Sequence, residues 1–256
     1  MSTGILVVSF GTTFDDTREK NIGAVCHDIQ EEFAPMPVYQ AFTSGMVRTS
    51  LARRGITISS VDEALKQMHK DGITRVAILP THLLYGEEFD KLCAQAQGCR
   101  TLFKEIKIAK PLLAGDKDFI AVLTTLAQVL PTQTGEALVL MGHGTAHFCN
   151  TVYGALDCRA KALGLDHLFV GTVEAWPDFD AVIAALKKGG FTGALVTPLM
   201  LVAGDHATND MASDEKDSWK TRLTQNGFAC RTVVRGLGEY SAIRKLYCSH
   251  LAEVLP

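Results

Sequence analysis

The stretch Leu138–His143, which reads LVLMGH, is an apolar run that ends in a glycine and a histidine. Two later runs lead to polar residues in the same way: LFVGTVE ends in Glu174, and ALVTP at residues 194–198 leads on to His206. The intervals between the three polar residues are 31 and 32 residues. One strand with its crossover helix takes roughly 30 residues. The spacing therefore predicts successive strand–helix units of a parallel sheet.

His143, Glu174 and His206 would then lie at the carboxyl ends of successive parallel strands, on one edge of a sheet. That edge is where open α/β folds bind ligands. Two imidazoles and a carboxylate can hold a divalent cation and leave coordination positions open for chemistry. Each residue taken alone also fits a structural role, as a surface histidine or an ion-pair partner. The joint spacing favours a metal site.

Apolar runs alternate with amphipathic stretches along the whole chain. The runs are dense in Val, Ile and Leu, which is typical of strands buried on both faces of a sheet. Helical patterns lie between them; one begins near Asp15 and another after Ser60, where acidic residues suit a helix N-terminus. This order predicts an α/β fold with parallel sheets flanked by helices. The expected strands are Ile5–Phe10, Val38–Thr43, Arg75–Leu79, Ile106–Ala109, Ala137–Met141, Leu168–Glu174, Ala194–Thr197 and Cys230–Val234.

The two halves of the chain repeat each other. LVVSFGT at residues 6–12 matches VLMGHGT at residues 139–145. In each half a strand also ends in a proline that is followed, after five residues, by a glycine and an acidic residue, at 80–87 and at 198–205. Self-similarity of this kind indicates a duplicated structural unit.

We therefore expect two similar α/β domains, at residues 1–130 and 131–256, with a cleft between them. In the repeat, Phe10 aligns with His143, and a second apolar residue aligns with Glu174. The ligand set is thus concentrated in the second domain, whereas the first domain offers apolar groups. Such a cleft would suit a large planar ligand that lies beside a metal.

Composition excludes several classes of protein. The 256 residues include 25 basic and 28 acidic ones, for a net charge of −3, so no basic stripe indicates binding to nucleic acid. The seven cysteines contain no Cys-x-x-Cys pair, which is typical of reduced thiols. The apolar runs are too short to span a bilayer, and the first expected strand leaves no room for a signal peptide. We expect a cytoplasmic protein without a membrane partner.

Further charged residues are candidates for the same chemistry. Glu87 and Glu88 take the place of the third ligand in the first half, where they would either begin a solvated helix or handle a cation or a proton. Arg48, Arg53 and Arg54 follow the second expected strand. They would either cover a solvated helix face or pair with substrate carboxylates through bidentate hydrogen bonds.

Other catalytic motifs are missing from the sequence. It contains neither a Gly-x-Gly-x-x-Gly turn after a strand nor a Gly-x-x-x-x-Gly-Lys-Ser/Thr phosphate loop, so a nucleotide cofactor has no support. It also lacks the Gly-x-Ser-x-Gly elbow of serine hydrolases. His82, which follows Pro80-Thr81, is interpreted as a structural residue.

Four groups of short motifs recur along the chain: VVSFGTT at residues 7–13, LPTH at 79–82 with GEE at 86–88, MGHGT at 141–145, and PLM at 198–200 with GDH at 204–206. With these motifs the chain resembles a known family, the anaerobic sirohydrochlorin cobaltochelatases. These enzymes belong to the class II chelatases, which include protoporphyrin ferrochelatase. The resemblance covers nearly the whole chain, and its short motifs are specific in their order and spacing.

The resemblance implies insertion of cobalt(II) into sirohydrochlorin, a lyase-type step of oxygen-independent cobalamin biosynthesis in which two pyrrole protons are lost. It implies His143, Glu174 and His206 as metal ligands, with His143 also accepting a proton. Glu88, or else Glu87, would assist metal delivery from the first domain. Cobalt(II) would be the substrate metal, and neither a nucleotide nor a redox cofactor would be needed. The expected tetrapyrrole contacts are Phe10, Arg48, Arg53 and Arg54.

Two alternatives stay open on the sequence. One is iron(II) insertion into sirohydrochlorin to give siroheme, although the Irving–Williams order favours cobalt(II) at a nitrogen and oxygen site. The other is a non-catalytic carrier of a tetrapyrrole or a metal, which would not need a proton acceptor beside its ligands. The sequence also leaves open whether the chain forms a homo-oligomer.

Overall fold

The computed structural model describes residues 2–255 and divides them into two compact units. The first unit runs to Ala114 and includes the segment from Gly238 onward, and the second unit is Gly115–Leu237. Each unit contains a four-stranded parallel sheet, in the order β2-β1-β3-β4 in the first and β6-β5-β7-β8 in the second. The expected α/β class with two similar parallel sheets is confirmed.

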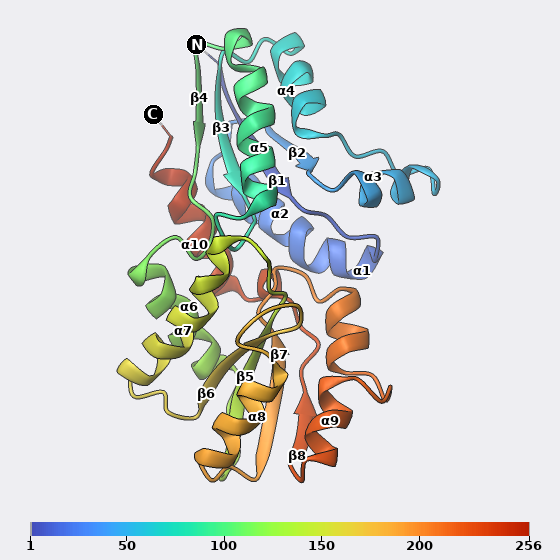
Figure 1. Cartoon of the computed structure of the whole chain (residues 1–256). Helices are drawn as coiled ribbons and strands as arrows, with labels where there is room; N and C mark the ends of the chain where they lie inside the picture. The colour runs from blue at the N-terminus through green and yellow to red at the C-terminus, as the bar shows by residue number, and fades with distance from the viewer. Residues whose placement is uncertain (1, 256) are drawn as a thin grey trace. The chain divides into compact units, whose positions relative to one another are not determined.

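The first unit places helices on both faces of its sheet (Figure 1). Helices α4 and α5 lie together on one face, and α2 and α10 lie together on the other. Its elements are β1 (Thr3–Ser9), α1 (Asp15–Arg18), η1 (Glu19–Gly23), α2 (Ala24–Glu32), β2 (Val38–Phe42), α3 (Gly45–Ala52), α4 (Val61–Lys70), β3 (Arg75–Pro80), α5 (Glu87–Gly98), η2 (Arg100–Leu102), β4 (Glu105–Ile108), η5 (Leu237–Glu239, which begins at the unit boundary) and α10 (Ser241–Ala252).

The second unit has the same layers. Helices α8 and α9 pack on one face of its sheet through a shared apolar core, and α6 and α7 lie together along the other (Figure 1). Its elements are α6 (Asp116–Val129), β5 (Glu136–Gly142), η3 (Phe148–Asn150), α7 (Thr151–Ala162), β6 (Leu168–Thr172), α8 (Phe179–Lys188), β7 (Gly193–Pro198), η4 (Ala207–Met211), α9 (Trp219–Gln225) and β8 (Ala229–Thr232).

All eight expected strands form, and the apolar runs of β1, β3, β5, β6 and β7 are largely buried. Every residue of the central strand β5 is buried, and six of the seven residues of β1 are buried. Such strands are covered on both faces, which is why their sequences do not alternate. The expected helix after Ser60 begins with a capping box, in which Ser60 and Glu63 satisfy each other's backbone N–H groups.

Two helices belong to the opposite unit from the one that the expected domains, 1–130 and 131–256, assign them to. Helix α6 belongs to the second unit, where Asp116 pairs with Arg159 of α7 at 2.8 Å. Helix α10 belongs to the first unit, where Arg244 pairs with Asp28 of α2 at 2.7 Å. The repeat therefore locates the strands correctly, but it places the boundary too late and assigns the last helix to the other unit.

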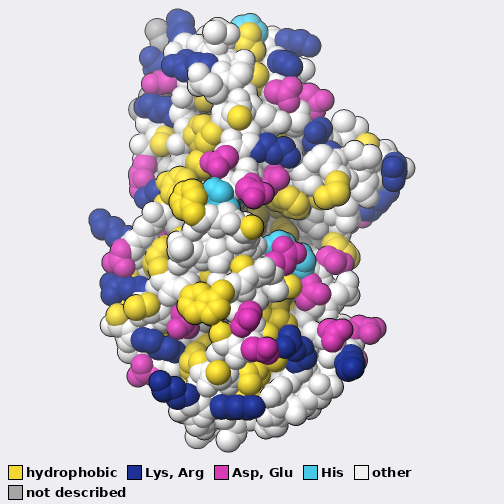
Figure 2. Space-filling view, viewed as in Figure 1, with side chains coloured by type: hydrophobic (Ala, Val, Ile, Leu, Met, Phe, Trp, Pro, Cys, Tyr) yellow, Lys and Arg dark blue, Asp and Glu magenta, His cyan; other side chains and the backbone are white. Residues whose placement is uncertain are grey.

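The surface charges, the cysteines and the helices agree with what the composition leads us to expect. On the face shown in Figure 2, Lys and Arg side chains are interspersed with Asp and Glu. None of the seven cysteines forms a disulfide bond within residues 2–255. Within residues 2–255, every helix is too short or too polar to cross a bilayer.

Candidate metal centre

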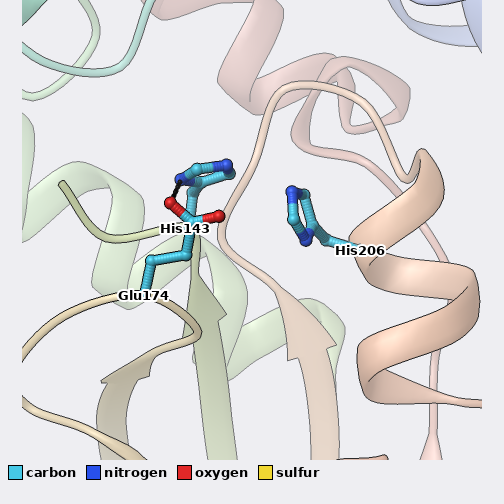
Figure 3. Close-up of side chains that lie close together, drawn as sticks. All are labelled: His143, Glu174 and His206. Carbon is cyan, nitrogen blue, oxygen red and sulfur yellow. Dashed lines mark ion pairs between the residues drawn. The ribbon is translucent and has the colours of Figure 1, made fainter.

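Three neighbouring strand ends bring His143, Glu174 and His206 together. Strand β5 pairs with both β6 and β7 in parallel, so the carboxyl ends of all three strands lie at one edge of the second sheet. His143 directly follows β5, Glu174 lies two residues after β6, and His206 immediately precedes η4 in the segment after β7. Figure 3 shows the three side chains converging above this edge.

Two glycines allow the chain to turn sharply at His143. A Cβ on Gly142 would lie 2.3 Å from the ring of Tyr153, so the strand end fits closely against α7. Gly144 has a φ of +86°, and a Cβ there would lie 2.8 Å from the backbone nitrogen of Ala175. The backbone N–H of Glu174 donates to the His143 carbonyl at 2.9 Å. These close contacts fix the loop of Glu174 against the loop of His143.

The three potential ligand atoms all lie within 4.8 Å of one another. His143 Nδ1 is 3.6 Å from Glu174 Oε2, and the rings of His143 and His206 are nearly perpendicular with centroids 4.5 Å apart. Atoms bound at about 2.1 Å to one ion lie less than about 4 Å apart. Small side-chain rotations would therefore gather all three donors around a divalent cation.

The candidate centre is open to solvent. The side chains of His143, Glu174 and His206 are 46%, 54% and 32% exposed. A structural metal site is usually closed by four protein ligands, whereas a site that does chemistry keeps a coordination position open. Three accessible protein ligands suit a cation that is delivered to another molecule.

The ring nitrogens of the two histidines are not equivalent. His143 Nδ1 lies 2.7 Å from the Gly144 carbonyl oxygen, and His206 Nδ1 lies 2.5 Å from Asp210 Oδ2. A backbone carbonyl only accepts, so His143 Nδ1 carries the hydrogen and donates it. The other nitrogen, Nε2, then keeps its lone pair for a metal ion or a proton.

The expected residues of the first unit lie at the corresponding sheet edge. Phe10 follows β1 and is 47% exposed, and Glu87 and Glu88 begin α5. Lys91 Nζ is 3.6 Å from Glu88 Oε1, so a positive charge balances this carboxylate. Within residues 2–255, the buried Glu88 Oε2 has no hydrogen-bond partner. A buried acceptor without a partner is unusual, and a bound cation would satisfy it.

His82 lies in the same part of the first unit. Its Nε2 is 3.4 Å from Thr43 Oγ1. Burial lowers the pKa of His82 to about 4, while the nearby Glu88 carboxylate raises this pKa and the Lys91 ammonium lowers it. The imidazole is therefore neutral near pH 7.

This environment predicts a dependence of stability on pH. An unfolded histidine has a pKa of about 6.5, so the unfolded chain binds a proton below that pH while folded His82 stays neutral until about pH 4. Its contribution is present above pH ~6.5 and is lost as the pH falls through this window, by up to about 3 kcal/mol. His82→Gln should flatten the pH dependence of the free energy of unfolding, measured by urea denaturation between pH 7 and pH 4. An unchanged slope would contradict this environment for His82.

The three candidate arginines differ in the salt bridges that they form. Arg48 Nη1 lies 3.4 Å from Glu63 Oε2. Arg54 pairs with Asp15, donates to the Thr13 carbonyl at 2.6 Å, and lowers the pKa of the Asp15 carboxyl. Among the residues described, Arg53 alone of the three forms no salt bridge, and it lines a shallow pocket beside α3.

Comparison with solved structures gives the class of this fold. SirB from Bacillus subtilis, in its Fe3+ form, superposes with a TM-score of 0.67 over 99% of this chain and 95% of SirB, at 13% identity. CbiX, described as the terminal enzyme for siroheme biosynthesis in denitrifying bacteria, gives a TM-score of 0.57 at 17% identity, over 99% of this chain and all of CbiX. The protein has the chelatase fold.

Sequence comparison gives the family. The model of the cobalt chelatase family CbiK matches residues 3–256, and the chain belongs to this family. The sirohydrochlorin cobaltochelatase of Salmonella typhimurium is 40% identical over 257 residues, covering the whole chain and 97% of the relative. The sirohydrochlorin cobaltochelatase CbiKC of Nitratidesulfovibrio vulgaris is 34% identical over 97% of this chain and 89% of its own length.

Proposed function

We propose that this protein inserts cobalt(II) into sirohydrochlorin in cobalamin biosynthesis, with the loss of two pyrrole protons. The observation that supports it most is the open group of His143, Glu174 and His206, whose donor atoms lie within 4.8 Å of one another in a member of the cobalt chelatase family. The relatives that are 40% and 34% identical are both named sirohydrochlorin cobaltochelatases, which favours cobalt over iron.

In this reaction the three side chains hold cobalt(II) until the macrocycle takes it. Neutral Nε2 atoms and a carboxylate bind the cation without filling its coordination sphere. Binding energy holds the macrocycle in a bent form that exposes its pyrrole nitrogens. Cobalt then exchanges its side-chain ligands for ring nitrogens.

His143 is also the proton acceptor in this scheme. When cobalt leaves its Nε2, the lone pair of that nitrogen becomes free to take a proton from a pyrrole nitrogen. The bond from Nδ1–H to the Gly144 carbonyl, at 2.7 Å, would stabilise the resulting imidazolium. His143 takes one of the two pyrrole protons in this way, and water at the solvent-exposed centre takes the other. In the first unit, the Glu88 carboxylate, with its unpartnered Oε2, would assist in delivering the metal.

Arg53 is the arginine best placed to meet a carboxylate of the tetrapyrrole, because its guanidinium is not committed to an acidic neighbour, unlike those of Arg48 and Arg54. Arg53→Ala should raise KM for sirohydrochlorin by roughly 10- to 100-fold while kcat changes little, since a charged hydrogen bond contributes about 1.5–3 kcal/mol. Arg100→Ala, which removes an arginine bound to backbone carbonyls at η2, is the matched control. Equal KM values for the two variants would contradict a role for Arg53.

Turnover in the absence of oxygen tests the proposed activity. The absorption spectrum of sirohydrochlorin is followed after catalytic amounts of protein and cobalt(II) are added, in parallel with iron(II) and with metal alone. We expect many turnovers, faster with cobalt(II) than with iron(II). A spectral change that stops at one equivalent would mean that the protein is a carrier, and a rate equal to that of metal alone would also contradict the proposal.

A further inference from the structure

The third ligand of the candidate centre has a carboxylate partner that the sequence motifs do not include. Asp210 Oδ2 lies 2.5 Å from His206 Nδ1. The two residues are four positions apart on the short helical segment that continues into η4 (Ala207–Met211). This spacing puts both side chains on one face of the turn.

The contact decides which nitrogen of His206 can bind a metal. An ionised carboxylate only accepts hydrogen bonds, so Nδ1 carries the hydrogen and Nε2 keeps the lone pair. His143 reaches the same tautomer by a different route, because its Nδ1 donates to the Gly144 carbonyl at 2.7 Å. Both rings therefore present Nε2, and only for His206 does the acceptor come from a side chain.

The other acidic side chains near His206, Asp205 and Glu174, contact other residues. Asp205 Oδ1 accepts from Asn209 Nδ2 at 2.8 Å, and Glu174 Oε2 faces His143 at 3.6 Å. The His206 side chain is 32% exposed, so packing alone restrains its ring only in part. Among the described residues, the His206 ring contacts the edge of the His143 ring, and its Nδ1 is hydrogen-bonded to the Asp210 carboxylate.

We propose that Asp210 is a positioning residue for cobalt binding: it fixes the tautomer and orientation of His206 and makes Nε2 a stronger ligand. The proposal rests on the proposed function of His143, Glu174 and His206 as the cobalt site. Carboxylate partners of metal-bound histidines typically contribute 10- to 100-fold to metal affinity or activity. The negative charge of Asp210 also favours a cation at the centre.

Cobalt(II) binding to the full-length protein without tetrapyrrole tests this role. The Kd and the visible absorption bands of bound cobalt(II) are measured at one fixed pH. Asp210→Ala should raise Kd by roughly 10- to 100-fold and alter the bands. Asp210→Asn should give an intermediate Kd, because an amide oxygen can accept the same hydrogen bond without the charge. Asp205→Asn is the matched control and should bind cobalt as the unaltered protein does.

His206→Ala, which removes the candidate ligand itself, is the reference for the loss of this ligand from the site. If it weakens cobalt binding while Asp210→Ala and Asp210→Asn do not, the positioning role is overturned and the cobalt site stands. If His206→Ala also binds cobalt normally, the site itself is overturned. Unfolding temperatures of all variants show whether a loss of binding comes from a loss of folding. Should Asp210→Ala fail to fold, the decision rests on Asp210→Asn, for which an unchanged Kd and spectrum would refute the proposal.

Discussion

Replacing His143 with alanine is expected to abolish cobalt insertion while the fold stays intact. The change removes a metal ligand and the proposed proton acceptor at once, and general base catalysis alone typically contributes 10²- to 10⁴-fold. We therefore expect kcat/KM to fall by at least about 10³-fold. The side chain is 46% exposed, so its loss should change the free energy of unfolding by no more than about 0.5 kcal/mol.

The matched control for this variant is His27→Ala. His27 is also an exposed histidine beside a carboxylate, Glu31, but it lies on α2 of the first unit. Its replacement should leave the insertion rate within about twofold of the original. Retained chelatase activity in His143→Ala, measured by the same spectral assay, would refute the assignment of His143.

Replacing Tyr247 with alanine is expected to give the largest loss of stability. Tyr247 lies on α10 and is fully buried in the first unit, and its Oη donates to the Thr81 carbonyl at 2.9 Å. Removing a large buried aromatic side chain typically costs about 3–5 kcal/mol. Tyr247→Phe should cost about 1–2 kcal/mol, because it leaves the ring in place and only the Thr81 carbonyl unpaired.

The same experiment tests whether the inner face of α10 is buried. Ser249→Ala, at an exposed position of the same helix, is the control and should change the free energy of unfolding by about 0.5 kcal/mol or less. Urea denaturation followed by circular dichroism gives the comparison. A Tyr247→Ala variant as stable as Ser249→Ala would contradict the burial of this helix against β3 and α2.

The strands and the clustering of the three candidate ligands could be predicted because local sequence determines them. A strand buried on both faces must be apolar throughout, so runs such as those of β1 and β5 are visible without any knowledge of the fold. Parallel strands also bring their carboxyl ends to one edge, so equal spacing was enough to expect His143, Glu174 and His206 together. The structure brings these three side chains together.

The exchange of α6 and α10 between the units could not be predicted in this way. A helix pattern shows which face is apolar but not which sheet that face covers, and the choice depends on contacts such as those of Tyr247 and Arg244, far apart in sequence from their partners. The internal repeat shows that there are two units. The sequence similarity between them is weakest near the unit boundaries, so it does not locate those boundaries.

The polar partners around the candidate ligands are also hard to predict from sequence motifs. Asp210 has a signal, because it lies four residues after His206 on a helical stretch, but this spacing alone is common. For the arginines, sequence gave no means of ranking Arg53 above Arg48 and Arg54, since the difference lies in the acidic neighbours that tertiary structure brings to each.

The central claim is that three side chains hold the cobalt that is inserted. A crystal of the protein equilibrated with cobalt(II), with anomalous diffraction recorded at the cobalt absorption edge, locates the ion directly. We predict one strong peak about 2.0–2.2 Å from the ring nitrogens of His143 and His206 and from a Glu174 carboxylate oxygen. A peak bound by other residues, with these three side chains free of metal, would contradict the account.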